Sequence, residues 1–448
     1  MYKIFKNSGW LLADKLARLF LGLITMAMIA RHIGPELFGI WNFAIALTTI
    51  AGSFSVLGLD KVVVKEVVSY PERQDRIIAS ALAMRLAAGF AAFILCLGIV
   101  TVMKPHATVY LYCTAITAIN IILQSFEVFD YCYQAKNEVQ KVIIPRVTVF
   151  IFFCLLKMTA VYMNGTLLTF LWLTLVELLF TCVVILFRYL ENGRALFRAV
   201  NGAEIKYLFL HSWPLMFTGV LVLLYMKSDQ LMLDTFGSSV QLGEYAAAAR
   251  ISELWYAIPT VIATALLPGL VRKREEHMEE YRQAIERWLR LSFWLSVLIA
   301  VSISFMAGRL TAILYGVQYP QSGLILAIHI WANIPVFLCV AIMQYQIVEG
   351  AYNINLYATI AGIIVNLAVN LLLIPHTGGA GAAIATVVSY IAVCSTLIVL
   401  DRTGQIRFFM LRMLMPSRAL QDARQVLDAL RDYTENLLSV IREKPLTK

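Results

Sequence analysis

The chain has 448 residues, of which 60% are hydrophobic and 15% are charged, and its net charge is +9 at pH 7. Its mean hydropathy is +0.75, whereas a soluble domain is about 45–50% apolar and about 25% charged. A water-soluble fold cannot bury this much apolar surface, so the composition predicts an all-α polytopic membrane protein. No motif for binding nucleic acid accompanies the positive charge, which we attribute to membrane topology.

Twelve segments are long and apolar enough to cross a bilayer as helices, which takes about 20 residues each. In chain order they are 8–30, 39–59, 77–103, 107–130, 142–163, 167–187, 207–227, 244–270, 290–313, 322–348, 356–374 and 380–400. The N-terminal sequence MYKIFKNSGW lacks a small-residue cleavage site, so we interpret it as the start of the first span.

The positive residues indicate how these spans are oriented. With the N-terminus inside, 28 of the 37 Lys and Arg residues fall in the N-terminus, the inner loops and the C-terminal tail. Because Lys and Arg favour the cytoplasmic side, both termini are predicted to be cytoplasmic and the number of spans to be even. The longest outer loop, around 228–243, has only about 16 residues, which leaves no room for an outer soluble domain.

The chain repeats itself. ARHIGPELFGIWNFAIAL, residues 30–47, aligns with DTFGSSVQLGEYAAAARI, residues 234–251, at an offset of 204 that places Gly39 on Gly243 and Ala46 on Arg250. A weaker match at an offset of 216 aligns YQAKNEVQKVIIPRV with EGAYNINLYATIAGI. Both repeats join corresponding spans, so we predict two six-helix lobes that enter the membrane in the same orientation, although small residues near loops can also recur by chance.

The predicted organisation follows from this repeat. An N-terminal lobe (1–190) and a C-terminal lobe (207–400) are joined by a cytoplasmic linker (191–206) and related by a pseudo-two-fold axis along the membrane normal. Residues 401–448 form a cytoplasmic tail, in which apolar residues from Leu420 to Ile441 are near helical spacing. We predict an amphipathic helix that docks on the membrane or on the protein, with a regulatory or partner-binding helix as the alternative.

Four short motifs occur in order along the spans: GPELFGIWNFAIAL, GLDKVVVKEV, GEYAAAAR and IPHTGGAGAAIATVVS. With them the chain, from about residue 5 to 400, resembles the polysaccharide flippases, of the O-antigen translocase type, in the multidrug/oligosaccharidyl-lipid/polysaccharide exporter superfamily. The resemblance implies a bacterial inner-membrane protein that moves an isoprenoid-diphosphate-linked oligosaccharide to the periplasmic leaflet for surface polysaccharide (O-antigen-like) biosynthesis. Membrane lipids and the polysaccharide polymerase machinery are the other expected partners.

Charged residues within spans are candidate functional residues, because each costs several kcal/mol unless it meets a wet cavity or a partner. Arginine offers phosphate a bidentate fork, so we predict a cationic cleft for the diphosphate, formed by Arg18, Arg250, Arg85 and Lys15. The resemblance favours Arg18 and Arg250, because cations of the first and eighth helices line the cavity of the related lipid-linked cell-wall-precursor flippases. The alternative is neutral pairing within one helix, Asp14 with Arg18 and Arg250 with Glu253.

A second set of residues is predicted to act in gating or in ion coupling: Asp14, Glu253, Lys227, Asp229, Glu127 and Asp130. Lys227 and Asp229 lie at the outer end of the seventh span and either gate the exit or meet water. Glu127 and Asp130 either bind a coupling proton or cation or are solvated helix-end residues. The identity of the coupling ion, proton or sodium, is left open.

Two other sets of residues are interpreted as structural. Lys157 and Glu177 lie at similar depths on consecutive spans, so we predict an ion pair inside the first lobe. The seven cysteines lie in or beside apolar runs without metal-ligand spacing, which is typical of buried packing residues. We therefore expect neither a metal nor a cofactor.

Two other functions compete with a flippase. A cation-coupled multidrug exporter of the same superfamily would favour a cavity dominated by carboxylates, whereas the span charges here are mostly positive. A membrane polymerase or ligase of lipid-linked glycans would need a sizeable outer loop to bind its acceptor. The sequence therefore favours a transporter that is not an enzyme and that works by alternating access.

Overall fold

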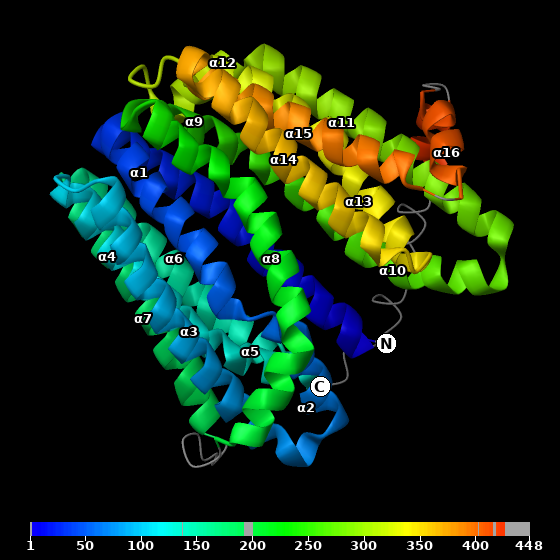
Figure 1. Ribbon diagram of the computed structural model, residues 1–448, viewed down its shortest axis with the longest axis horizontal. Helices are drawn as coiled ribbons and strands as arrows, with labels where there is room; N and C mark the ends of the chain where they lie inside the picture. Colours follow the sequence, from blue (N-terminus) through cyan, green and yellow to red (C-terminus); the bar gives the residue numbers. More distant parts are fainter. Residues whose placement is uncertain (1, 137, 192–199, 402, 415–417, 426–448) are drawn as a thin grey trace, which may run out of the picture. The chain divides into compact units, whose positions relative to one another are not determined.

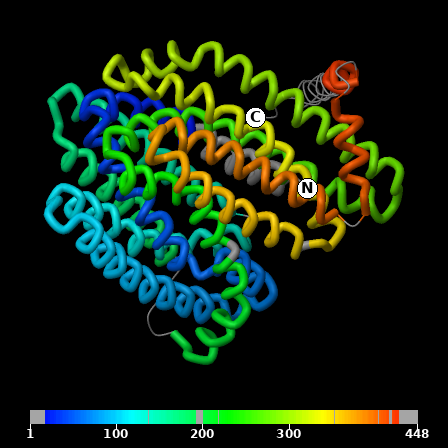
Figure 2. The backbone as a smooth tube through the Cα atoms, turned by 45° about the horizontal axis from the view of Figure 1, so that its top comes forward, coloured from blue at the N-terminus to red at the C-terminus, as the bar shows by residue number. Residues whose placement is uncertain are grey.

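The computed structural model describes residues 2–136, 138–191, 200–401, 403–414 and 418–425 (Figures 1 and 2). Within these residues every regular element is a helix, which confirms the all-α fold class. The α-helices are α1 (Tyr2–Val56), α2 (Leu59–Ser69), α3 (Gln74–Met103), α4 (Thr108–Leu123), α5 (Val128–Ala135), α6 (Gln140–Tyr162), α7 (Leu167–Leu190), α8 (Gly202–Phe236), α9 (Ser239–Glu253), α10 (Ala257–Glu276), α11 (Met278–Tyr315), α12 (Ser322–His329), α13 (Asn333–Val348), α14 (Tyr352–Thr377), α15 (Gly379–Val399) and α16 (Gln405–Met413). Short 3₁₀ helices are η1 (Pro71–Arg73), η2 (Gln124–Glu127), η3 (Leu254–Tyr256) and η4 (Ile330–Ala332).

Eleven helical stretches of the described chain are long and apolar enough to cross a membrane. Ten of them contain, to within one residue, the third to twelfth predicted spans. The first, Arg18–Ser69, has 52 residues and takes in the second predicted span and the latter part of the first. Only Gly34 leaves helical geometry inside α1, with φ 83° and ψ 167°. Residues with a Cβ rarely adopt such a φ, so the predicted outer turn is made at one glycine.

The described chain packs as two compact units, each built from segments that are distant in sequence. The first unit comprises Met1–Leu254, Met306–His329 and Gly362–Ser389, and the second comprises Trp255–Phe305, Ile330–Ala361 and Tyr390–Lys448. Two of the borders fall at η3 and η4. Residues 192–199 of the predicted linker lie outside the described residues, and the division into two six-helix lobes remains a prediction.

In the first unit, α1 packs against α3, α4 and α6, while α7 packs on α4 and α6 (Figure 1). The short helix α2 buries Leu59, Val63 and Val67, which share one face because they are spaced by four residues. They join a hydrophobic cluster with Phe129 and Tyr189, whose ring centroids are 4.5 Å apart. All seven cysteines of the chain are buried and free of disulfides, as the sequence predicts.

The two copies of the repeated phrase pack against each other in the first unit, where α1 meets α9. A Cβ added at Gly39 would overlap the carbonyl oxygen of Ser239, and one added at Gly243 would overlap the carbonyl oxygen of Pro35. Ser239 is the equivalent of Pro35 at the offset of 204. The contact is therefore reciprocal, and the two segments are related by a local two-fold arrangement that brings their backbones close together.

The second unit contains α10, α13, α16 and parts of α11, α14 and α15. Its apolar cluster of Ile299, Ala300, Ile330 and Phe337 packs on Trp255. The tail belongs to this unit as far as it is described. Its first helix, α16, buries Ile406, Phe409 and Met413 at a helical spacing of three and four residues. The segment 418–425 is also helical, and the rest of the amphipathic helix predicted to end at Ile441 lies outside the described residues.

We predict that Gly39→Ala and Gly243→Ala each lower the thermal stability of the purified protein. The added methyl group would force the backbones of α1 and α9 apart, and overpacking of this kind costs about 1–3 kcal/mol. Gly98→Ala in α3 is the matched control, because a Cβ there meets nothing within 4 Å and alanine favours a helix. Thermal unfolding in detergent measures the difference, and equal midpoints for the three variants would contradict the role of the close contact.

Candidate functional site

A charged cavity of about 240 Å³ lies in the first unit. Its lining brings together Arg18 of α1, Arg146 of α6, Glu127 of η2 and Glu177 of α7. The guanidinium of Arg18 lies 5.3 Å from the ring centroid of Phe150, which holds it against α6. The lining offers two guanidinium groups that can donate to an anion, and with its two carboxylates the formal charge of these four residues is zero.

A neutral cavity of about 270 Å³ adjoins the charged one, and Asn120 and Gln124 line both. It is lined by hydroxyl and amide side chains of α1, α4 and η2 among aliphatic ones. The hydroxyls of Thr48 and Thr117 each donate to a carbonyl oxygen of their own helix at 2.7 Å, so their oxygens can accept from a ligand. The Oδ1 atom of Asn120 is buried and has no hydrogen-bond partner, which points to a ligand or water at this position.

An apolar groove of about 380 Å³ continues from the neutral cavity and shares Ser53, Val56 and Leu223 with it. The groove lies between the end of α1 and α8, where Leu215, Met216, Gly219, Val222 and Leu223 contribute most of one wall. Asp60 and Lys61 of α2 add two charges at its lining. Charged, neutral polar and apolar surfaces therefore follow one another within one unit.

The predicted cationic residues do not gather at one point. Arg85 is fully buried, donates to the Tyr131 hydroxyl at 3.1 Å and lies 3.6 Å from Glu127. It therefore reaches the charged cavity only through Glu127. Arg250 lies beside α1, with its guanidinium 5.9 Å from the Phe38 ring centroid. The side chains of Asp14 and Lys15 lie outside the described part of the chain.

The carboxylates find partners that sequence spacing does not reveal. Lys157 and Glu177 form the predicted ion pair, at 2.6 Å, which confirms that prediction. Asp130 pairs with Arg146, a residue that was not among the predicted site residues. Glu253 pairs with Lys227 at 3.6 Å, and the structure records no pairing of Glu253 with Arg250. Since Lys227 and Glu253 lie on neighbouring helices, only the fold brings them together.

Asp229 is at the centre of a buried polar cluster rather than beside water. Its carboxylate accepts from the Tyr245 hydroxyl and from the backbone N–H of Gln230, and Tyr245 also lies 3.2 Å from the Thr386 hydroxyl. The adjacent Ser228 donates to Asn366 at 3.0 Å, which links the cluster to α14.

The amide side chains of α14 extend this buried cluster. Asn370 donates to Asn366 at 2.9 Å, and its own Oδ1 atom has no partner. His329 of α12 meets the Tyr245 ring edge-on, with a centroid distance of 5.7 Å. The cluster thus offers a carboxylate with hydroxyl and amide oxygens, the ligand types that hard cations prefer. Among the described residues, no group of three or more His, Cys, Asp or Glu side chains could hold a metal ion.

A second buried carboxylate ties α8 to the α3–α4 turn. Asp234 lies 2.8 Å from the Lys104 ammonium and accepts from the Tyr110 hydroxyl at 2.6 Å. Lys104 also lies 5.0 Å from the Tyr110 ring centroid. This contact joins segments about 130 residues apart, near the end of α8 that leads into the reciprocal α1–α9 contact.

Known proteins resemble this chain in sequence and in fold. Residues 4–273 match a family described as polysaccharide biosynthesis protein. A Shigella flexneri protein described as an O-antigen transporter is 23% identical over 345 residues, which cover 70% of this chain and 78% of that protein.

Two solved structures share the fold. An inward-facing multidrug resistance MATE family transporter of the MOP superfamily has a TM-score of 0.71 at 15% identity, covering 89% of this chain and 96% of its own. The lipid II flippase MurJ, in an inward closed conformation, has a TM-score of 0.69 at 13% identity, covering 94% and 92%. At these identities the two structures support the fold alone.

We predict that Lys157→Met destabilises the protein by about 3 kcal/mol, because it leaves the Glu177 carboxylate, which is only 16% exposed, without its lysine partner. Adding Glu177→Gln to Lys157→Met should restore most of the loss. The pair of Lys141 and Glu138 serves as the control. Its charged atoms are 2.8 Å apart, but its side chains are 55% and 41% exposed. Removing one of its members should change stability by at most about 1 kcal/mol. Thermal unfolding decides the matter: similar losses at both sites would show that the buried pair is not special.

Proposed function

The chain belongs to the family of polysaccharide biosynthesis proteins, and we propose that it is a flippase for a lipid-linked oligosaccharide. Its cargo would be an isoprenoid-diphosphate-linked repeat unit, moved from the cytoplasmic to the periplasmic leaflet for the synthesis of an O-antigen-like surface polysaccharide. The family match and the relative described as an O-antigen transporter bear out the resemblance seen in the four sequence motifs.

The observation that carries this proposal is that three surfaces of different chemistry adjoin one another in the first unit. The charged cavity suits a diphosphate, the neutral cavity suits sugar hydroxyls, and the apolar groove suits an isoprenoid chain. A cationic drug would need neither the two arginines nor the hydroxyl-rich cavity beside them.

Within this proposal, Arg18 and Arg146 contact the diphosphate directly, since both line the charged cavity. Arg85 acts as a positioning residue through Glu127. Arg250 would meet the headgroup only after the cargo has moved, because it lies at the α1–α9 contact instead of in this cavity. Lys15 is one turn before Arg18 on α1 and is kept as a further candidate.

Transport would proceed by alternating access. The predicted topology places the reciprocal glycine contact and the Asp234–Lys104 pair at the outer side, where they would close the exit. Opening requires that both contacts separate. The ion pair of Lys227 on α8 and Glu253 on α9 lies on the same two helices, and its geometry would change when these contacts separate.

The buried cluster around Asp229 is the proposed site of ion coupling. Its carboxylate is surrounded by oxygen atoms in an otherwise apolar helix bundle, and one amide oxygen, on Asn370, lacks a partner. A proton or sodium ion bound there would remove an uncompensated charge from the interior. Glu127 and Asp130 are instead engaged by arginines, which favours a structural or positioning role for them.

A cation-coupled multidrug exporter is the alternative function. The observation in its favour is the fold shared with the multidrug resistance transporter, at a TM-score of 0.71. We further propose that the chain is not an enzyme, that it resides in the bacterial inner membrane with both termini cytoplasmic, and that it works beside a polysaccharide polymerase. A C-terminal reporter that is active only outside the cytoplasm should remain silent.

Deletion in the native host tests the proposed function. We expect loss of surface polysaccharide, with lipid-linked repeat units accumulating in the inner leaflet. Drug sensitivity with intact surface polysaccharide would instead establish the multidrug alternative.

We predict that Arg18→Ala lowers flipping of a diphosphate-linked cargo in proteoliposomes by at least about tenfold, since it removes a hydrogen bond to a charged group. Arg76→Ala, an exposed arginine of α3, is the control and should leave the rate unchanged. Asn120→Leu should slow a cargo with a full oligosaccharide more than one with a single sugar. If Arg18→Ala transports like Arg76→Ala, the proposed diphosphate contact is wrong.

We also predict that Asp229→Asn uncouples transport from its driving ion. The substitution keeps the shape of the side chain and removes its charge, so the basal rate in the absence of a gradient should change little. Stimulation by an imposed proton or sodium gradient should fall by at least about tenfold. Tyr245→Phe, which removes the neighbouring hydroxyl but keeps the carboxylate, should retain most of the stimulation. Unaltered stimulation in Asp229→Asn would place coupling elsewhere.

A further inference from the structure

A cavity of the second unit is remote in sequence from the proposed transport path. It has a volume of about 680 Å³ and lies between the N-terminal part of α11, α16 and the segment 418–425. Both walls belong to regions that the predicted topology places in the cytoplasm, the loop 271–290 and the tail. Nothing in the proposed transport cycle uses this cavity.

Positive side chains dominate the lining of this cavity. Its five arginines are Arg282, Arg287, Arg290, Arg412 and Arg418, and its three carboxylates are Glu279, Glu286 and Asp422. The lining therefore has an excess of two positive charges. An arginine-lined concavity of this size is within the range of about 300–1,000 Å³ that small-ligand sites occupy.

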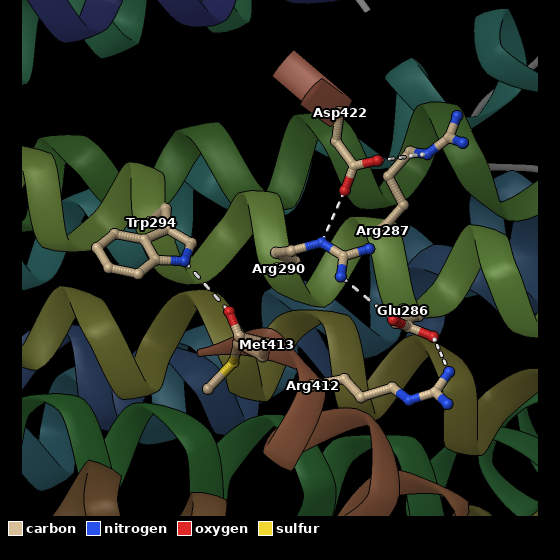
Figure 3. A network of polar contacts seen from close by, with 7 residues as sticks. All are labelled: Glu286, Arg287, Arg290, Trp294, Arg412, Met413 and Asp422. Atoms are coloured by element: carbon tan, nitrogen blue, oxygen red, sulfur yellow. Dashed lines mark hydrogen bonds and ion pairs between the residues drawn. The ribbon is translucent and has the colours of Figure 1, made fainter. Parts of the chain in front are cut away.

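A network of ion pairs fixes the central arginines in place (Figure 3). Arg290, whose side chain is only 7% exposed, donates to Asp422 at 2.7 Å and to Glu286 at 3.2 Å. Arg287 and Arg412 approach the same two carboxylates at 3.3 and 3.5 Å. Two carboxylates thus pair with three arginines, and each carboxylate has two arginine partners.

Three charged side chains of the lining, Glu279, Arg282 and Arg418, lie outside this network. Glu279 accepts a hydrogen bond from Gln283, which also lines the cavity. The Arg412 guanidinium lies 4.2 Å from the ring centroid of Phe408, an orientation that limits its rotation. The remaining two arginines, Arg282 and Arg418, are exposed at the lining and supply the excess charge.

We propose that this cavity binds a phosphate-bearing anion with at least two negative charges. Guanidinium forks recognise phosphate oxygens in bidentate fashion, and five of them surround a space open to solvent. The ligand is either the headgroup of an anionic phospholipid from the inner leaflet or a soluble di- or triphosphate, which share this chemistry. Glu279, Glu286 and Asp422 weaken the attraction but leave the net charge of the lining positive.

Binding would join two parts of the chain that are far apart in sequence. Arg282 belongs to α11 and Arg418 to the described part of the tail, so one anion held by both would bridge α11 and the segment 418–425. The Arg290–Asp422 pair already makes this link without a ligand. The anion therefore adds to a preformed contact, and the site needs little rearrangement to bind.

The test uses the full-length protein and has two arms. In the first, the protein in nanodiscs of neutral phospholipid is titrated with inorganic pyrophosphate. In the second, binding of cardiolipin is measured in matched nanodiscs that contain this lipid. We expect saturable binding of at least one probe. The double variant Arg282→Gln/Arg418→Gln should bind about tenfold more weakly or worse, because each arginine contributes a hydrogen bond to a charged group. These two side chains are exposed and outside the ion-pair network, so the double variant should fold normally.

Two controls make the result specific. Arg272→Gln, an α10 arginine that is 73% exposed and does not line the cavity, should leave the affinity unchanged. Arg76→Gln, at an exposed arginine of α3 that does not line the cavity, should also leave the affinity unchanged. Pyrophosphate binding that depends on Arg282 and Arg418 indicates a soluble phosphate ligand, and retention of cardiolipin alone indicates a lipid headgroup. Absence of saturable binding to both probes, or equal affinity in the double variant and Arg272→Gln, overturns the proposal.

Discussion

The constraint on which this structure depends is the cost of leaving a charge unpaired in the apolar interior of a bilayer. The fold meets it by pairing charges across helices that are remote in sequence. Lys157 of α6 reaches Glu177 of α7, and Lys104 reaches Asp234 across about 130 residues. Each pair satisfies two groups and at the same time selects which helices can be neighbours. Pairing therefore determines the packing of the bundle as well as its electrostatics.

Arginines also line two cavities of the described chain. Arg18 and Arg146 line the charged cavity, and the arginines of the second unit surround the larger cavity beside the tail. The two sites differ in their surroundings. The first adjoins hydroxyl-rich and apolar surfaces, which suits a cargo with several chemical parts, whereas the second is dominated by charge and suits a small anion.

Much of the fold could be predicted from the sequence because the signals are long or local. Apolar runs of about 20 residues predict the positions of membrane helices. The structure has apolar helices at the third to twelfth predicted spans, while the first two spans fall in one helix that is broken only at Gly34. The Lys157–Glu177 pair was predictable because both charges lie at similar depths around one turn. The repeat at an offset of 204 aligned two segments that the structure places in contact as α1 and α9, a contact that the alignment alone did not predict.

The candidate site was less predictable, because its partners are set by tertiary packing. Helical spacing allowed Glu253 to pair with Arg250, but the crossing of α8 and α9 gives it Lys227 instead. Arg146 follows Pro145 near the start of α6, and no local pattern indicates that it lines the charged cavity. Asn120 is a neutral residue in an apolar run, and only the orphaned oxygen atom in the structure reveals it. Spacing along one helix cannot supply information about a neighbour's face.

The reciprocal glycine contact has a consequence for how the two copies of the repeated phrase can diverge. It is an isologous interface of the kind found in two-fold homodimers, where each side presents the same patch to the other, yet both sides lie in one chain. In a true homodimer every substitution would appear twice across the axis. Here each copy can change alone, provided that Gly39 and Gly243 keep the backbones in contact. This is seen at Arg250, which has Ala46 as its counterpart. The symmetric contact at the two glycines therefore joins two surfaces that differ in charge. Such asymmetry can give transport a direction while the glycine contact stays unchanged.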